Sequence, residues 1–182
     1  SYENEAKIMK YSAYYVEEID GVFSASISEL ELEKPSDGFV QIQVSCSSLN
    51  YKDALSASGN KGVTRNYPFV PGIDAAGTIS EANSSNFVEG DEVLVTGYDM
   101  GMNTPGGFGE FINVPANWVV KKPSALTSIE AMSIGTAGLT AAASVLKIQD
   151  SSQESDLPIL VSGATGGVGS IGAVSYTHLT LP

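Results

Sequence analysis

The stretch LPILVSGATGGVGS, residues 157–170, decides the fold of this chain. Its apolar start is typical of a buried strand, and the glycines after it predict a tight turn into a helix that opens at Val168. Four of these glycines leave the backbone bare where a dinucleotide pyrophosphate needs close approach, and the helix start offers free N–H groups to that anion. They are Gly163, Gly166, Gly167 and Gly169. The stretch therefore predicts dinucleotide binding.

The predicted site lies close to the end of the chain. A strand-helix-strand unit needs about 30 residues or more, so we expect only its first strand and the start of its helix within residues 149–182. The acidic or basic residue that chooses between NAD and NADP is expected after the second strand, beyond Pro182. The residues present leave that choice open.

The final stretch SYTHLTLP, residues 175–182, breaks the apolar stripe of the preceding segment. Thr177, Thr180 and Pro182 are poor helix formers, so we expect the helix not to continue and these residues to be a non-native tail. His178, the single histidine, lies in this tail and is given no role.

The composition is that of a globular protein, with 42% hydrophobic and 16% charged residues in 182. The net charge of −12, from 21 acidic and 9 basic residues, argues against a nucleic-acid partner. We expect no membrane-spanning segment, because no stretch approaches about 20 consecutive apolar residues. The single cysteine, Cys46, and the lack of a signal-peptide pattern at the start predict a cytoplasmic protein, with Cys46 as a small buried strand residue.

Alternating apolar and polar residues over 7–49 predict short antiparallel strands, with turns at 19–21 and 35–38. A short helix is expected over 53–58, and further strands over 92–97 and 109–115. The period changes at 124–148, where alanine-rich helical spacing is interrupted at 135–138. We therefore divide the chain into a β-rich domain over 1–123, connecting helices over 124–148 and a truncated α/β domain over 149–182.

Six short strings follow one another in a recognisable order. They are LNYKD (49–53), YPFVPGIDAAG (67–77), EGDEVLVTG (89–97), GGFGEF (106–111), GTAGLTAA (135–142) and GATGGVG (163–169). Together they resemble the medium-chain dehydrogenase/reductase superfamily, and within it the zinc-free YhdH/YhfP group of acrylyl-CoA reductases and quinone oxidoreductase-like proteins. The resemblance implies a mixed α/β fold, in which a GroES-like β-barrel catalytic domain is followed by the beginning of a Rossmann domain.

The resemblance also bears on metal binding. Zinc-dependent members place a cysteine at the position of Asn50 and a histidine at the position of Ile73, so no metal is expected. Hydride addition to an activated C=C bond or to a quinone is then a better candidate than reduction of a simple carbonyl. We expect an NADPH-dependent reductase of a small enoyl thioester such as acrylyl-CoA, with an NADPH:quinone oxidoreductase as the alternative. The complete protein is expected to be a homodimer, and a non-catalytic fragment or interaction module stays open for this chain.

Two adjacent residues are the catalytic candidates. Tyr51 is expected to contact the nicotinamide end of the cofactor, and Asn50 to donate a hydrogen bond to substrate, whereas Asp53 is expected to cap the following helix. Packing of Tyr51 against the barrel is the alternative for that residue. Lys52 and Arg65 are either surface charges or contacts to the phosphates of CoA or NADP, and the sequence leaves both interpretations open.

The remaining candidates concern the cofactor. Thr136 and Thr140 are expected along the nicotinamide ribose and phosphates, with simple packing as the alternative. The pyrophosphate is assigned to the glycine turn. Its residues are Gly163, Thr165, Gly166, Gly167 and Val168.

Overall fold

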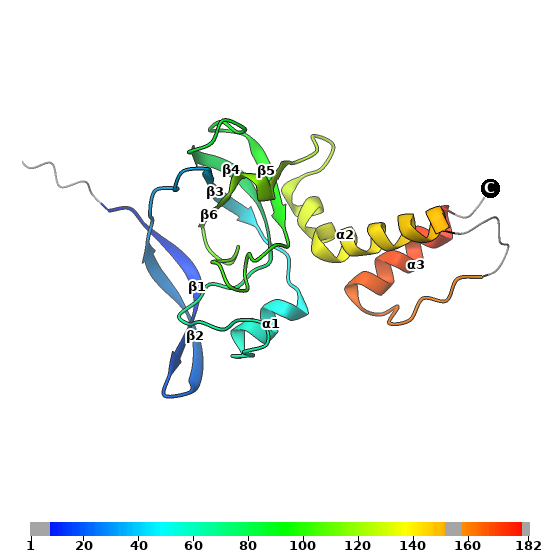
Figure 1. The fold of residues 1–182 in the computed structure, drawn as a ribbon, viewed down its shortest axis with the longest axis horizontal. Coiled ribbons are helices and arrows are strands. Elements are labelled where there is room, and N and C mark those ends of the chain that lie inside the picture. The colour runs from blue at the N-terminus through cyan, green and yellow to red at the C-terminus, as the bar shows by residue number, and fades with distance from the viewer. Residues whose placement is uncertain (1–7, 152–157, 180–182) are drawn as a thin grey trace, which may run out of the picture. The chain divides into compact units, whose positions relative to one another are not determined.

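The computed structural model describes residues 8–151 and 158–179 (Figure 1). The chain divides into two compact units, residues 1–133 and 134–182. Each is described by itself below.

The first unit opens with a long antiparallel hairpin, the blue ribbon in Figure 1. β1 (Lys10–Ile19) pairs with β2 (Val22–Glu31), so that Lys10 lies opposite Glu31. Asp20 and Gly21 turn the chain with φ of 52° and 78°, a left-handed conformation that aspartate and glycine tolerate. The turn therefore lies where the sequence predicts it.

A five-stranded antiparallel sheet, in the order β6-β3-β4-β5-β7, forms the body of this unit. Its strands are β3 (Phe39–Cys46), β4 (Asp74–Ala82), β5 (Glu92–Thr96), β6 (Phe111–Pro115) and β7 (Val119–Lys121), with a 3-10 turn at Ala116–Trp118. The buried core contains Val40, Ile42, Ile79, Val93, Val95 and Met100. Strands β3 and β4 approach closely at Gly77, where a Cβ would lie 2.0 Å from the Gln43 carbonyl oxygen. The strands that alternation predicts are confirmed.

Strand β1 also contacts two loops of the first unit. The Tyr14 N–H donates to the Phe108 carbonyl at 2.7 Å, and the Val16 N–H donates to the Phe69 carbonyl at 2.8 Å. The first bond holds β1 against the 105–109 loop and the second holds it against the segment before β4. Tyr14 and Phe108 lie beside the short helix α1 (Tyr51–Ala57), which follows β3. Helix α1 begins two residues earlier than predicted.

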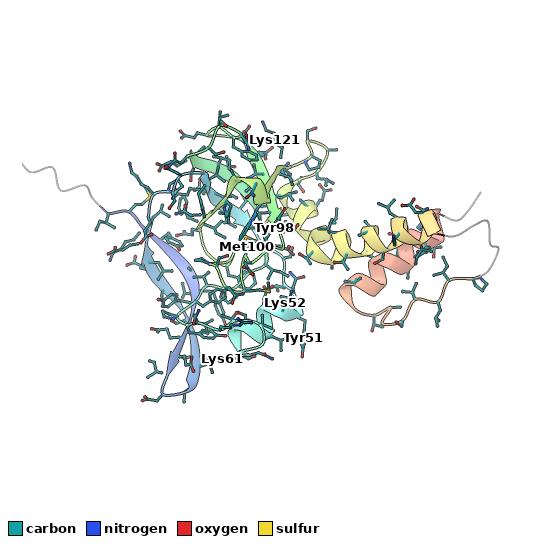
Figure 2. All side chains as sticks on the ribbon, viewed as in Figure 1. Tyr51, Lys52, Lys61, Tyr98, Met100 and Lys121 are labelled. Carbon is teal, nitrogen blue, oxygen red and sulfur yellow. The ribbon has the colours of Figure 1, made fainter. Side chains whose placement is uncertain are left out.

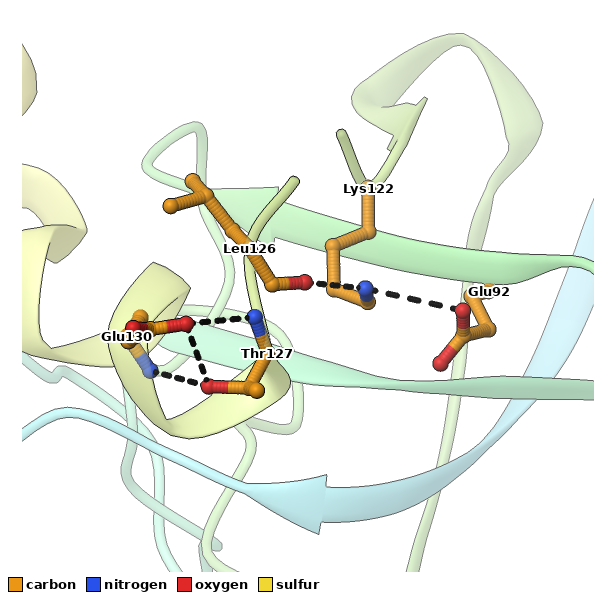
Figure 3. A network of polar contacts seen from close by, with 5 residues as sticks. All are labelled: Glu92, Lys122, Leu126, Thr127 and Glu130. Atoms are coloured by element: carbon orange, nitrogen blue, oxygen red, sulfur yellow. Dashed lines mark hydrogen bonds and ion pairs between the residues drawn. The ribbon is translucent and has the colours of Figure 1, made fainter. Parts of the chain in front are cut away.

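The start of α2 (Ser128–Ser151) is anchored by polar contacts (Figure 3). The Glu130 carboxylate accepts the Thr127 N–H at 2.8 Å, and the Thr127 hydroxyl oxygen accepts the Glu130 N–H at 3.2 Å. This capping box satisfies N–H groups that a helix start leaves unpaired. The Lys122 ammonium donates to the Leu126 carbonyl and pairs with Glu92 at 3.5 Å, which ties the segment before the helix to β5.

Helix α2 is interrupted, as the sequence predicts. Gly135 has φ of 49° and ψ of −157°, so two helices meet there. By length and composition Ser128–Asp150, with a mean hydropathy of 1.4, would suffice to cross a membrane, contrary to our expectation that no stretch comes near that limit. Because Gly135 divides the segment into two helices shorter than the roughly 20 residues of a span, this similarity does not establish a membrane segment.

The second unit corrects two predictions. Residues 158–161 form no strand, and Leu160 is 94% exposed, although a buried strand was expected there. A parallel strand exists only through hydrogen bonds to neighbouring strands, and none lies beside these residues in the described part of the chain. Helix α3 (Gly167–Leu179) continues past Ser175, so the prediction that the helix stops was wrong. The Thr177 hydroxyl donates to the Ala173 carbonyl at 2.8 Å within it. Thr180 and Pro182 lie outside the described residues.

Candidate functional site

The first candidate site lies where β3 runs into α1. Asn50 is the N-cap of α1, and its backbone N–H donates to the Asp53 carboxylate at 2.8 Å. This is one half of a capping box, in which a residue three positions into the helix reaches back to the cap. Asp53 therefore caps the helix, as its spacing predicts.

Two buried carboxylates hold the Asn50 region in place. The second Asp53 oxygen accepts the Ile73 N–H at 3.0 Å, and the Asp74 carboxylate accepts the Asn50 side-chain Nδ2–H at 2.9 Å. Asp53 is 3% and Asp74 0% exposed. The start of α1 is thereby bound to the start of β4 through both its backbone and its side chain.

Burial sets the ionisation of Asp53. Desolvation raises the pKa of the Asp53 carboxyl above its ordinary value and is the largest effect. The N–H donors of Asn50 and Ile73 lower this pKa in part, and the nearby Asp74 carboxyl raises it. Both oxygens of Asp53 accept N–H groups, an arrangement that favours the charged form. Asp53 and Asp74 are thus a compact pair of buried carboxyl groups next to Asn50.

A hollow of about 500 Å³ lies in front of Asn50. Its wall is mostly apolar, with the Asn50 amide as a polar group able to meet a ligand. The lining residues are Tyr14, Leu49, Asn50, Asp53, Ala54, Ala57 and Phe108. The rings of Tyr14 and Phe108 meet edge to face with their centroids 6.4 Å apart. An apolar pocket with few polar groups is typical of a site for a small molecule.

Sequence reasoning missed two residues of this wall. Phe108 was given no role and Tyr14 was not singled out, because the contact between β1 and the 105–109 loop joins residues far apart in the chain. The GGFGEF string marks the loop but does not indicate which strand it meets.

Tyr51 and Lys52 lie at the start of α1 (Figure 2). Tyr51 is 80% exposed, which disfavours the alternative that its ring packs against the barrel and leaves the ring able to meet a ligand. Lys52 and Arg65 are exposed, as both of their interpretations require. The contact of Tyr51 with a nicotinamide stays a prediction.

Cys46 lies at the end of β3, half-buried rather than fully buried. Partial burial raises the pKa of its thiol, which favours the less reactive neutral form. The strand position is confirmed.

The second candidate site is the glycine turn of the second unit. Gly163 has φ of +64°, its carbonyl accepts the Gly166 N–H at 2.9 Å, and a Cβ on Gly169 would lie 2.1 Å from the Gly163 oxygen. Thr165, Gly166, Gly167 and Val168 are exposed, and the first helical hydrogen bond runs from the Ser170 N–H to the Gly166 carbonyl. The N–H groups of the first turn of α3 therefore face outward at a bare, exposed helix start. These residues fit a pyrophosphate, which such N–H groups bind.

Thr136 and Thr140 lie in α2 just after the Gly135 break. The Thr140 hydroxyl donates to the Thr136 carbonyl at 2.8 Å, within the helix. Gly138 lies between these two threonines, and a Cβ at that position would lie 2.3 Å from the Ile134 side chain. Their predicted contact with the cofactor stays a prediction.

This chain is similar in sequence and in fold to known proteins. Residues 36–124 match the model of the alcohol dehydrogenase GroES-like domain. The chain is 42% identical over 167 residues to Escherichia coli AcuI, named as a probable acrylyl-CoA reductase, a match covering 91% of this chain and 51% of that protein. The crystal structure of the yhdH oxidoreductase from Salmonella enterica in complex with NADP superposes with a TM-score of 0.85 at 41% identity, over 91% of this chain and 51% of that one.

The chain belongs to the medium-chain dehydrogenase/reductase superfamily.

A further member of the superfamily is similar to this chain. YhfP of Bacillus subtilis, named as a quinone oxidoreductase, is 46% identical over 145 residues, covering 79% of this chain and 43% of that protein. Its crystal structure with NAD bound has a TM-score of 0.84. The chain spans about half the length of the curated superfamily members it matches. The predicted family and its GroES-like domain are thus confirmed.

Proposed function

We propose that these residues belong to an NADPH-dependent oxidoreductase that transfers hydride to the activated C=C bond of a small enoyl thioester. The observation that carries the proposal is the Asn50 amide, which lines an apolar hollow and is held from behind by a buried carboxylate. The likeness to AcuI, named as an acrylyl-CoA reductase, supports the substrate class.

Each residue has a defined part in this proposal. When bound, NADPH supplies the hydride that the β carbon of the substrate accepts. Negative charge then develops on the thioester oxygen, and the Asn50 amide donates a hydrogen bond to it. Tyr14, Leu49 and Phe108 give the acyl group an apolar wall that limits water around the developing charge.

The cofactor is proposed to meet three sets of residues. The glycine turn, Gly163 to Val168, binds the pyrophosphate through backbone N–H groups. Thr136 and Thr140 lie along the ribose and phosphates, and Tyr51 contacts the nicotinamide. NADPH is favoured over NADH by the relative solved with NADP, whereas the YhfP structure holds NAD.

Two features of the wider protein are also proposed. We infer a homodimer for the complete protein, in line with the pairing of Rossmann domains in the resembling family, and a cytoplasmic location, in line with a single free cysteine. Size-exclusion chromatography with light scattering tests the first, and fractionation tests the second.

The substrate is tested by following NADPH oxidation by the complete protein. Turnover with acrylyl-CoA is expected, and Asn50→Ala should lower kcat about 100-fold, because one oxyanion donor is removed. Glu89→Gln, at an exposed turn away from the hollow, is the matched control and should leave kcat unchanged.

The second candidate function is an NADPH:quinone oxidoreductase, favoured by the 46% identity to YhfP. Turnover with quinones in the absence of any with enoyl thioesters would establish it and overturn the first. Cofactor fluorescence separates both from a non-catalytic interaction module, since a protein that quenches no NADPH signal at millimolar cofactor is not an oxidoreductase of this kind.

A further inference from the structure

Asp74 has a role that the sequence does not indicate. Its place in the resembling family suggests only hydrogen bonding within a turn, but its carboxylate reaches across to the side chain of Asn50, 24 positions earlier, at 2.9 Å. It is fully buried. A buried charge without a good partner is costly, so the contact to Asn50 is part of what makes this position tenable.

The chemistry of the pair fixes the orientation of the Asn50 amide. The two ends of an asparagine amide are nearly equal in size, and they differ in that one end donates and the other accepts. A carboxylate only accepts, so the amide nitrogen faces Asp74, and a flipped amide would set its oxygen against a negative charge.

Asp74 is itself held firmly. It is the first residue of β4 and lies opposite Thr96 of β5, while the Gly97 N–H donates to the Ile73 carbonyl at 3.1 Å. Asp53 fixes the backbone of both Asn50 and Ile73. The amide is thus oriented by a group built on a sheet, which is more rigid than a loop.

We propose that Asp74 is a positioning residue, which holds the Asn50 amide with its nitrogen toward the carboxylate and so sets which atoms of the amide a ligand in the hollow can meet. The inference rests on the proposed function for the identity of the acceptor, a substrate oxygen. The orientation itself is independent of it. Without Asp74, one of the contacts that orient the amide is lost, and its nitrogen is held less firmly.

The first test needs no activity. In the 182-residue chain, the Asn50 side-chain amide is observed by 15N-edited NMR, with Asn50→Ala identifying its signals. One Nδ2 hydrogen should exchange with solvent at least about tenfold more slowly than an exposed amide, and Asp74→Ala should remove this protection. Asp74→Asn should retain part of it, because an amide oxygen still accepts. If the Asn50 Nδ2 hydrogens exchange with solvent at the same rate in the wild type and in Asp74→Ala, the proposed orientation of the amide is overturned.

The second test is a double-mutant cycle in the complete protein. Asp74→Ala should lower kcat about tenfold while the KM for NADPH stays within twofold, and Asp74→Asn should lower it less. In an Asn50→Ala background Asp74→Ala should lower kcat no further, because the group it positions is gone. Equal losses in both backgrounds mean that Asp74 supports the fold only, and they overturn the proposal.

A control separates positioning from stability. Ile79→Val removes one methyl group from the buried face of the same strand, away from Asn50, and should lower the melting temperature without lowering kcat. If Asp74→Ala fails to fold, the cycle with Asp74→Asn decides in its place. If the complete protein reduces neither enoyl thioesters nor quinones, the proposed function fails, and the NMR experiment still decides the orientation.

Discussion

The substitution Gly169→Ala is the sharpest perturbation of the glycine turn. A Cβ at this position would lie 2.1 Å from the Gly163 carbonyl oxygen and 2.6 Å from its carbon. These are backbone atoms, which cannot swing aside as a side chain would. Since real Cβ atoms essentially never come within 3.0 Å, α3 and the turn must separate by about 0.9 Å, the difference between 3.0 and 2.1 Å.

The cost follows from the hydrogen bonds that this movement breaks. The bond from the Gly166 N–H to the Gly163 carbonyl is 2.9 Å long, and lengthening it by nearly 1 Å takes it beyond hydrogen-bond range. That loss costs about 1 kcal/mol, and displacing one N–H from a bound phosphate costs about 1.5–3 kcal/mol more. The first loss is present with or without the cofactor and lowers stability, so only the second, about 1.5–3 kcal/mol, weakens dinucleotide binding, by about 12- to 160-fold.

The assay is a fluorescence titration of the complete protein with NADPH. Gly172→Ala is the matched control, since it lies in the same helix and a Cβ there meets nothing within 4 Å among the described residues. We expect its dissociation constant to stay within about twofold, with a helix more stable by up to about 1 kcal/mol. A dissociation constant for Gly169→Ala within threefold of the wild type would refute the assignment of the pyrophosphate to this turn.

Three further predictions concern the stability of the first unit. Thr127→Ala removes the cap of α2 and should cost about 1 kcal/mol in urea unfolding, whereas Thr78→Ala, outside any cap, should cost less. The Thr127 donors lower the pKa of Glu130, so its contribution to stability is present above the ordinary carboxyl value of 4.5 and is lost as the pH falls; Glu130→Gln should therefore destabilise the protein at pH 7 but not at pH 3. Ile42→Ala, at a fully buried position of β3, should cost about 2–5 kcal/mol, and a cost below 1 kcal/mol would contradict the core described above.

Features that depend on neighbouring residues in the chain were predictable from the sequence. Alternation gave the strands, because a sheet with one buried face needs an apolar residue at every second position. The helix break was visible because Gly135 alone tolerates the left-handed φ found there. The pairing of Asn50 with Asp53 follows from their spacing of three residues at a helix start.

Features that depend on distant partners were not predictable in the same way. The apolar residues at 159–161 line a hollow of about 510 Å³ together with Val145 and Tyr176. They form no strand because, within residues 8–151 and 158–179, no neighbouring strand offers them hydrogen bonds. Thr177 did not end α3, because its helix propensity differs from that of alanine by only a fraction of 1 kcal/mol. The free energy gained when the α3 residues before Thr177 pack outweighs so small a difference in helix propensity.

The residue at position 50 is explained by its neighbours in the chain together with a distant partner. Serine, aspartate and asparagine cap helices about equally well, so capping of α1 alone does not explain an asparagine. Of these three, asparagine carries a side-chain N–H donor for the Asp74 carboxylate beside the oxygen that accepts the Asp53 N–H at the helix start. Aspartate there would face Asp74 with like charge, and serine would have a single hydrogen to give. The identity of this helix cap is therefore explained by a carboxylate on β4 together with the helix start itself.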